Sequence, residues 1–357
     1  MKTVMVFFLL VTPALAQQEA EQPEPARPTG AAAAAFPDRT DRNITLDVVV
    51  TDKSGKAVAG LQQQDFMVLD DKLAQNLKSF RAVEAGSSAP PVSVILLVDA
   101  VNTSFQSVAY GRGQIESFLK QNGGKLAEPV TMVFFTDKDA KVQRESTRDG
   151  NALAASLDEY ATSLRTITRS QGFYGAEDRL RLSIQTLGML VAAEAKVPGR
   201  KLLVWISPGW PLLSGPGIQL SQKNEEGLFH SIVDLSTAMR QANVTLYSVD
   251  PLGTADAGGT RTSYYKEFTK GVKAAKNVEI GNLGLQVLAY QSGGRVFNSS
   301  NDIAGEIASA ATDANAYYVL SFDAPPPDGP VQYHALEVKL DKPGLTARTR
   351  TGYYALK

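Results

Sequence analysis

The apolar residues in the middle of the chain gather in four short, continuous runs. These runs are Val92–Asp99, Val130–Phe135, Lys201–Ser207 and Val244–Val249. A run this short, rich in large and β-branched apolar side chains, is typical of a strand that is buried on both faces of a parallel sheet. We expect the run that ends at Asp99 to lie at the centre of that sheet.

Segments with the apolar spacing of helices separate these runs. They lie near residues 109–121, 150–164, 176–193, 224–243, 283–291 and 302–312, and shorter strands are expected at 141–144 and 295–297. Repeated alternation of strand and helix predicts an α/β fold with a doubly wound, mostly parallel, six-stranded, Rossmann-like sheet. Ligands of such sheets bind beyond the carboxyl ends of the strands, and Asp99 lies at such an end.

The two flanks of this region have the alternating pattern of antiparallel strands. Strands are expected at 44–51, 66–69 and 75–83, and again at 317–322, 334–340 and 347–354. The first group is too small to be stable alone, so we expect it to pair with the second in a small β-sandwich-like unit. The predicted domains are therefore residues 43–84 and 315–357, which share that unit, and an inserted α/β domain at 92–314, reached through a linker at 85–91.

The N-terminus has the pattern of a secretory signal peptide. Lys2 precedes an apolar stretch, and Ala14-Leu15-Ala16 is a small-residue cleavage site, so residues 1–16 are predicted to be removed after Ala16. Residues 17–42 are rich in Pro, Glu and Ala, which is typical of a disordered linker. The alternative is a buried N-terminal helix. The prediction is a secreted or periplasmic protein whose mature chain has no transmembrane segment.

Composition narrows the class of partner. The formal net charge of −1 gives no reason to expect nucleic acid as a partner. The chain has no cysteine, which favours a bacterial envelope protein over a small disulfide-stabilised secreted domain.

Several segments together resemble a von Willebrand factor type A domain, and in particular the VWFA-related domain proteins common in acidobacteria. The segments are Val94–Asp99 with Ala100–Thr103, Val50–Gly55 with Gly60-Leu61 and Asp65-Phe66, Ser292–Arg295, and Arg350–Tyr354. The resemblance covers roughly residues 44 to 355. It implies a metal-ion-dependent adhesion site, in which Asp-x-Ser-x-Ser, a Thr and a further Asp hold Mg²⁺ for a partner's carboxylate.

The chain departs from that pattern at three places, one of which is the second loop, expected near residues 170–175, where no Thr is in register. Asp99 and Thr103 match oxygen ligands, but Val101 stands at the first Ser position and offers no oxygen. Ser207-Pro208-Gly209 stands where the family usually has Thr-Asp-Gly. The resemblance thus implies a degenerate site and no cofactor. The alternative is Mg²⁺ held by Asp99, Thr103 and Ser207. Without metal, Asp99 is expected to accept hydrogen bonds from the first turn of the following helix, a role that Asn102 and Thr103 could share.

The loops expected at the same edge carry large apolar and aromatic residues. The predicted partner-binding residues are Asn102, Phe173, Tyr174, Trp210, Leu212, Leu213, Tyr264 and Tyr265, the last two near Phe268 and interleaved with Lys266, Lys270 and Lys273. Exposed aromatics beside cations are typical of protein-binding patches. The alternative is that these loops fold over and bury their own apolar side chains.

Motifs for catalysis are weak. Ser207 has the strand–turn position of a hydrolase nucleophile, but the first Gly of G-x-S-x-G is missing and Pro208 removes an oxyanion N–H. The histidines, His230 and His334, are expected to be surface or packing residues, and the sequence has no phosphate-binding glycine motif. We therefore predict an exported, non-enzymatic, adhesion-like module for a protein or cell-surface partner. The alternatives are a Mg²⁺-dependent adhesion module and, more remotely, a hydrolase using Ser207.

Overall fold

The central sheet has seven strands in the order β11-β10-β9-β5-β6-β7, with β8 also paired to β6. This computed structural model describes residues 42–84, 92–103, 105–143, 145–163, 172–211, 220–252 and 264–357. The strands of the central sheet are β5 (Ser93–Asp99), β6 (Lys125–Phe135), β7 (Ala140–Val142), β8 (Thr147–Asp149), β9 (Lys201–Ile206), β10 (Val244–Val249) and β11 (Val296–Phe297). The first five strands of that order are mutually parallel, and β7 and β8 run antiparallel to β6. The mostly parallel sheet is confirmed, but the predicted six strands omitted β8, whose Thr-Arg-Asp sequence has no apolar signal.

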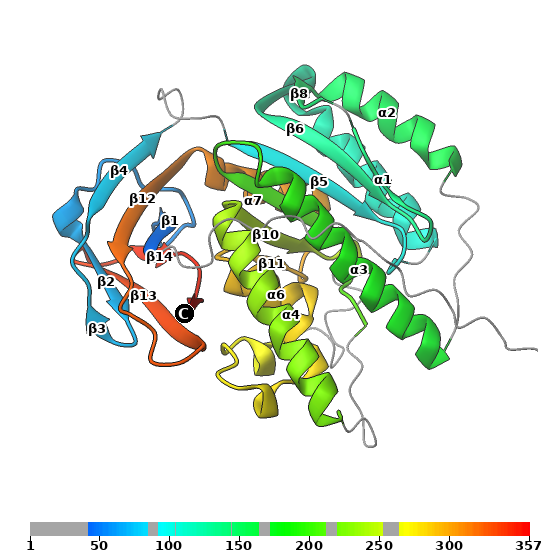
Figure 1. The fold of residues 1–357 in the computed structure, drawn as a ribbon. Coiled ribbons are helices and arrows are strands. Elements are labelled where there is room, and N and C mark those ends of the chain that lie inside the picture. Colours follow the sequence, from blue (N-terminus) through cyan, green and yellow to red (C-terminus); the bar gives the residue numbers. More distant parts are fainter. Residues whose placement is uncertain are drawn as a thin grey trace, which may run out of the picture. The chain divides into compact units, whose positions relative to one another are not determined.

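Helices cover both faces of this sheet (Figure 1). They are α1 (Phe105–Leu119), α2 (Gly150–Ser163), α3 (Gly172–Glu194), α4 (Gln222–Gln241), α6 (Leu285–Gln291) and α7 (Ile303–Ala311). Alternate residues of β5 pack into two different hydrophobic cores of the central sheet. Ile95 and Leu97 pack with residues of α3, α4 and α6, whereas Leu96 and Val98 pack with residues of α1, α2 and α7. This two-sided burial explains why β5 needs a continuous apolar run.

The flanking strands form two four-stranded antiparallel sheets, in the orders β14-β1-β12-β4 and β15-β13-β2-β3. Their bounds are β1 (Asn43–Thr51), β2 (Phe66–Asp70), β3 (Leu73–Ala74), β4 (Ser79–Glu84), β12 (Ala316–Asp323), β13 (Val331–Leu340), β14 (Thr346–Arg348) and β15 (Gly352–Leu356). Strands from the two ends of the chain pair directly, β1 and β4 with β12 and β2 with β13. The predicted pairing of the two flanks is present, and a third core that includes Leu46, Val68 and Phe322 lies between the sheets.

Two predicted strands differ from the structure in their extent. The strand predicted at 75–83 is shorter, because β4 begins at Ser79, and the segment 347–354 is split into β14 and β15. Residues 349–351 separate the latter two, and β14 pairs with β1 whereas β15 pairs with β13. The break therefore lets one C-terminal segment join both sheets.

The sandwich and the α/β part share buried residues. Tyr354 of β15 belongs to one core of the central sheet, and Val49 and Tyr317 belong to the other. Buried charges add to this contact, since Arg348 of β14 binds the carboxylate of Asp313. The two predicted units are thus held together by packing and by ion pairs.

Some predictions concern residues outside those that the structure describes. These are the signal peptide at 1–16, the linker at 17–42 except Arg42, and the linker at 85–91. Among the described helices, none combines the length and the apolar character that a membrane span requires.

Candidate functional site

Asp99 lies at the carboxyl end of β5 and is fully enclosed. Its Oδ1 accepts hydrogen bonds from the backbone N–H groups of Val101 (2.9 Å) and Asn102 (2.8 Å). Its Oδ2 accepts from the side-chain amide of Asn102 (2.8 Å) and from the indole N–H of Trp205 (2.8 Å). A carboxylate has about four lone-pair positions, so these four donors and the hydroxyl of Ser207 saturate it. Burial nonetheless raises the pKa of the Asp99 carboxyl, partly offset by the hydrogen bonds from Asn102, Trp205 and Ser207.

The structure brings Asp99 and Ser207 together and places Asn102 and Thr103 in the same loop. Ser207 is buried at the end of β9, interacts with Asp99, and its Oγ accepts the N–H of Gly209 at 3.2 Å. Thr103 Oγ1 and Asn102 Oδ1 are buried without a hydrogen-bond partner among the described residues. The loop therefore holds a satisfied carboxylate beside two unsatisfied oxygens.

The hydrogen bonds that Asp99 accepts differ in part from those of the predicted helix cap. The donors to Asp99 are Val101 and Asn102, which precede the start of α1 at Phe105. Asp99 thus closes a tight turn between β5 and α1. It also receives Trp205 from the neighbouring strand, a contact that local sequence could not indicate.

Trp210, predicted to face a partner, is buried with 2% of its surface exposed. Its ring packs edge-on against Trp205, with ring centroids 5.0 Å apart. The preceding Gly209 has a φ of +110°, and a Cβ there would meet the amide of Gln286 at 2.4 Å. The turn after Ser207 therefore directs Trp210 inward, and its predicted exposure is wrong.

The predicted residues in the other loops lie partly outside the described part of the chain. Leu212 and Leu213 are not described, and Phe173 and Tyr174 are described only as backbone in the first turn of α3.

The segment that contains Tyr264 and Tyr265 does not stay at the carboxyl edge beside Asp99. Thr269 accepts a hydrogen bond from Gln291 (3.3 Å), the last residue of α6. The opposite end of α6 is the one beside the turn after β9, where Gln286 donates to Pro208. Val272 accepts one from Tyr354 of β15 (3.1 Å). The prediction of one common loop face is therefore wrong, because residues 268–273 pack against the sandwich.

This segment lines a groove with a cavity volume of about 800 Å³. Its other wall is β13 and the end of α6, and its lining includes Phe268, Lys270, Lys273, Tyr290, Tyr333 and Leu336. Phe268 is buried, Tyr264 and Tyr265 are half-buried, and Tyr290 is 49% exposed. The sequence indicated the Tyr- and Lys-containing segment as a binding surface, but it gave no sign that β13 forms the opposite wall of the groove.

A second acidic group lies at the carboxyl edge of the sheet. Glu306 of α7 is almost fully buried, and its Oε2 has no hydrogen-bond partner among the described residues. Burial, with Asp250 and Asp302 adding repulsion, raises the pKa of Glu306 to about 7. No sequence signal marked this residue, because its environment is created by the end of β10 and the start of α7.

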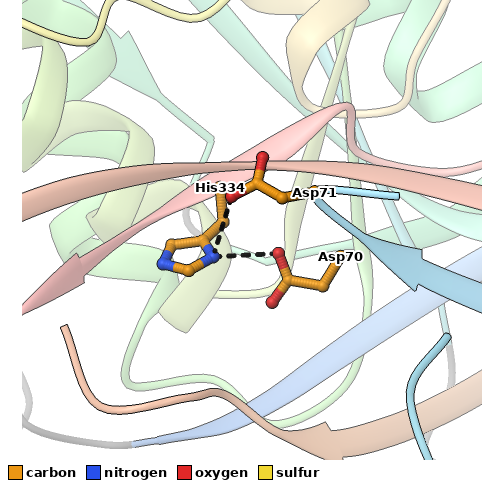
Figure 2. A group of neighbouring side chains, drawn as sticks. All are labelled: Asp70, Asp71 and His334. Atoms are coloured by element: carbon orange, nitrogen blue, oxygen red, sulfur yellow. Dashed lines mark hydrogen bonds and ion pairs between the residues drawn. The ribbon is translucent and has the colours of Figure 1, made fainter. Parts of the chain in front are cut away.

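Sequence reasoning also missed a cluster in the sandwich. His334 of β13 lies against Asp70, the last residue of β2, and Asp71 in the following turn (Figure 2). The sequence predicts a surface or packing role for His334, but the structure places it against two carboxylates. The antiparallel pairing of β2 with β13 brings them together across more than two hundred residues of sequence.

Comparisons with known proteins give weak likenesses only. No family model and no curated protein matches the chain. Similar solved structures include the pilus adhesin SpaC from Lactobacillus rhamnosus GG in its open conformation (9% identity, TM-score 0.39, covering 84% of this chain and 48% of that one). They also include manganese-loaded TRAP protein from Plasmodium vivax (10%, 0.36, 76% and 96%) and a mutant PilB minor pilin from Streptococcus sanguinis (11%, 0.32, 75% and 78%). The chain spans about half the length of the SpaC chain, and scores this low assign no family.

Proposed function

We propose that the chain is an exported, non-catalytic interaction module that binds an acidic segment of a partner protein in the groove between residues 267–282 and β13. The observation that carries this proposal is the groove itself, which combines exposed Tyr290 with two exposed lysines, Lys270 and Lys273. An aromatic side chain beside cations in a concave, partly apolar surface is the usual composition of a protein-binding site.

Charge supports the choice of an acidic partner. Residues 264–282 contain four lysines and two glutamates, a net charge of +2, in a chain whose formal net charge is −1. Lys270, Lys273, Glu267 and Glu279 line the groove, and the positive excess comes from Lys266 and Lys276 in the same segment. Within the described residues, none of the four lysines forms an ion pair. These charges remain available to a partner, and such contacts increase the rate of association and its dependence on salt.

The experiment is a selection from a random displayed-peptide library on the full chain. Enriched peptides should carry Asp or Glu with apolar residues, should bind more weakly at high salt, and should lose at least about tenfold in affinity with Lys270→Glu/Lys273→Glu. The matched control is Lys53→Glu/Lys196→Glu, which makes the same charge change at two exposed residues elsewhere. Peptides that bind both double variants as tightly as the wild type would disprove the groove as the site.

The proposed export is tested separately. Sequencing the N-terminus of protein recovered from the periplasm or medium of an expressing bacterium should give Gln17 as the first residue. An intact Met1 on protein retained in the cytoplasm would contradict it.

A second candidate function is Mg²⁺-dependent adhesion at Asp99, Thr103 and Ser207. The observation in its favour is that Thr103 Oγ1 and Asn102 Oδ1 are buried without partners beside a carboxylate, since Mg²⁺ prefers oxygen ligands. Against it, all the lone pairs of Asp99 are occupied by protein donors, so binding requires that loop to rearrange. Calorimetric titration of Mg²⁺ and Mn²⁺ into chelator-treated protein decides this. Heat that disappears in Thr103→Val supports the candidate, and absence of heat in the wild type rejects it.

Hydrolysis by Ser207 has no geometric support in the described residues. The side chain of Ser207 contacts Gly209 and Asp99, whereas His230 and His334 lie on α4 and β13. A serine triad uses a histidine as the base, and Asp99, the carboxylate beside Ser207, already accepts hydrogen bonds from other donors. Hydrolysis of a broad ester and peptide panel that disappears in Ser207→Ala would overturn the non-catalytic proposal.

A further inference from the structure

The turn between β2 and β3 places two carboxylates against one buried imidazole (Figure 2). Nδ1 of His334 lies 2.9 Å from Oδ1 of Asp70 and 3.4 Å from Oδ2 of Asp71. One ligand atom from each of the three residues falls within 4.8 Å of the other two. The side chains of His334 and Asp70 are 5% and 2% exposed, whereas that of Asp71 is 40% exposed.

In each carboxylate, the oxygen that does not face His334 accepts a hydrogen bond that orients the side chain. The hydroxyl of Tyr353 donates to Oδ2 of Asp70 at 2.7 Å, and the backbone N–H of Ala335 donates to Oδ1 of Asp71 at 3.1 Å. Oδ1 of Asp70 and Oδ2 of Asp71 are thereby left to face Nδ1 of His334. Outer contacts that fix ligand orientation in this way are a regular part of metal sites.

The two distances from Nδ1 of His334 to the carboxylate oxygens fit the ligands of a small divalent transition metal. Nitrogen and oxygen ligands lie about 2.0–2.2 Å from Zn²⁺, and adjacent ligands at tetrahedral or octahedral angles are therefore about 2.9–3.4 Å apart. With a neutral imidazole, the two carboxylates bring a charge of −2 to a largely buried place, which a divalent cation balances. We propose that Asp70, Asp71 and His334 form a binding site for a divalent transition metal of the zinc class, with a further ligand position open to solvent beside Asp71.

The metal-bound and metal-free states differ in the position of one proton. Without metal, an ionised carboxylate can only accept a hydrogen bond, so Nδ1 is the donor toward Asp70 and Asp71, and Nε2 has no partner among the described residues. With metal on Nδ1, the proton of the neutral ring is on Nε2. The tautomer of His334 therefore reports metal binding directly.

The test is ¹⁵N NMR of the histidine rings in untagged, chelator-treated full chain, titrated with Zn²⁺. The chain has only two histidines, so His230, which is exposed on α4, serves as an internal control. Binding should move the proton of His334 from Nδ1 to Nε2 with saturation near one Zn²⁺ per chain, leave His230 unchanged, and raise the melting temperature. A His334 ring that is unchanged at millimolar Zn²⁺ would overturn the proposal.

Two variants separate specific binding from surface adsorption. Asp71→Asn removes a ligand charge but keeps a side chain that tolerates the φ of +46° at this turn, so the fold is preserved. It should weaken Zn²⁺ binding at least about tenfold, a loss of the size seen when the shell of a metal site is altered. Asp341→Asn, at an exposed residue just after β13, should leave affinity unchanged. Equal affinity of both variants and the wild type would show that the metal is held elsewhere.

Discussion

The indole nitrogen of Trp205 donates a hydrogen bond to Oδ2 of Asp99 across 2.8 Å, between two neighbouring strands of the central sheet. Both residues are almost completely buried. A contact of this kind fixes the loop after β5, because it holds the same carboxylate that receives the N–H groups of Val101 and Asn102. The ring of Trp210 packs edge-on against the same indole, with ring centroids 5.0 Å apart.

The first prediction concerns this contact. Trp205→Phe should lower the free energy of unfolding by about 2–4 kcal/mol, because it removes a donor from a buried carboxylate and leaves a cavity. Trp210→Phe is the matched variant. It should cost less, about 1–2 kcal/mol, because Nε1 of Trp210 has no partner among the described residues. Urea unfolding followed by circular dichroism measures both, and equal losses would show that the bond to Asp99 is not the main contribution of Trp205.

The second prediction concerns the hydroxyl of Thr103. Thr103→Val should raise the free energy of unfolding by about 1 kcal/mol, because it removes a buried hydroxyl that has no hydrogen-bond partner. Ser292→Ala is the control, since its Oγ accepts from Leu246 and donates to Ala289, each at 3.0 Å. That change should destabilise the fold by about 1–2 kcal/mol. A loss of stability in Thr103→Val measured in Mg²⁺, but not after chelation, would instead support the metal-dependent candidate.

The third prediction concerns the buried ion pair of Asp47 and Arg200. Nε of Arg200 lies 3.2 Å from Oδ2 of Asp47, and their side chains are 2% and 7% exposed. Arg200→Met should cost about 3–5 kcal/mol because it leaves Asp47 charged and buried. Asp47→Leu should cost a similar amount, and the double variant should cost clearly less than the sum of the two. Strictly additive losses in urea unfolding at neutral pH would show that the pair is not coupled.

The fourth prediction is a pH dependence that originates at Glu306. Burial raises its pKa from 4.5 to about 7, so the folded chain binds a proton that the unfolded chain has released. The contribution of this proton to stability is complete below about pH 4.5 and is lost as the pH rises through about 7, with a slope of at most about 1.4 kcal/mol per pH unit. Glu306→Gln should flatten this part of the profile. A variant profile that falls as steeply as that of the wild type would assign the dependence to another group.

The chain's own pattern determined the interior of the central sheet. β5, β9 and β10 are buried at nearly every position, and a strand covered on both faces requires an uninterrupted apolar run, whatever its neighbours are. The alternation of strands and helices likewise follows from local periodicity. The pairing of the two flanks could be expected because neither group of strands can bury its apolar face alone.

Tertiary structure alone decided where the side chains of the loops meet. The sequence around Trp210 is compatible with an exposed or a buried ring, and only packing against Trp205 distinguishes them. The segment with Tyr265 and Lys270 shows no sign of its contact with β13, which follows it by more than sixty residues. Asp70 and His334 meet only through the pairing of β2 with β13. Apolar periodicity shows only which face of a helix or strand is buried. Strand order and register depend on the whole chain, and they decide which distant polar groups lie side by side.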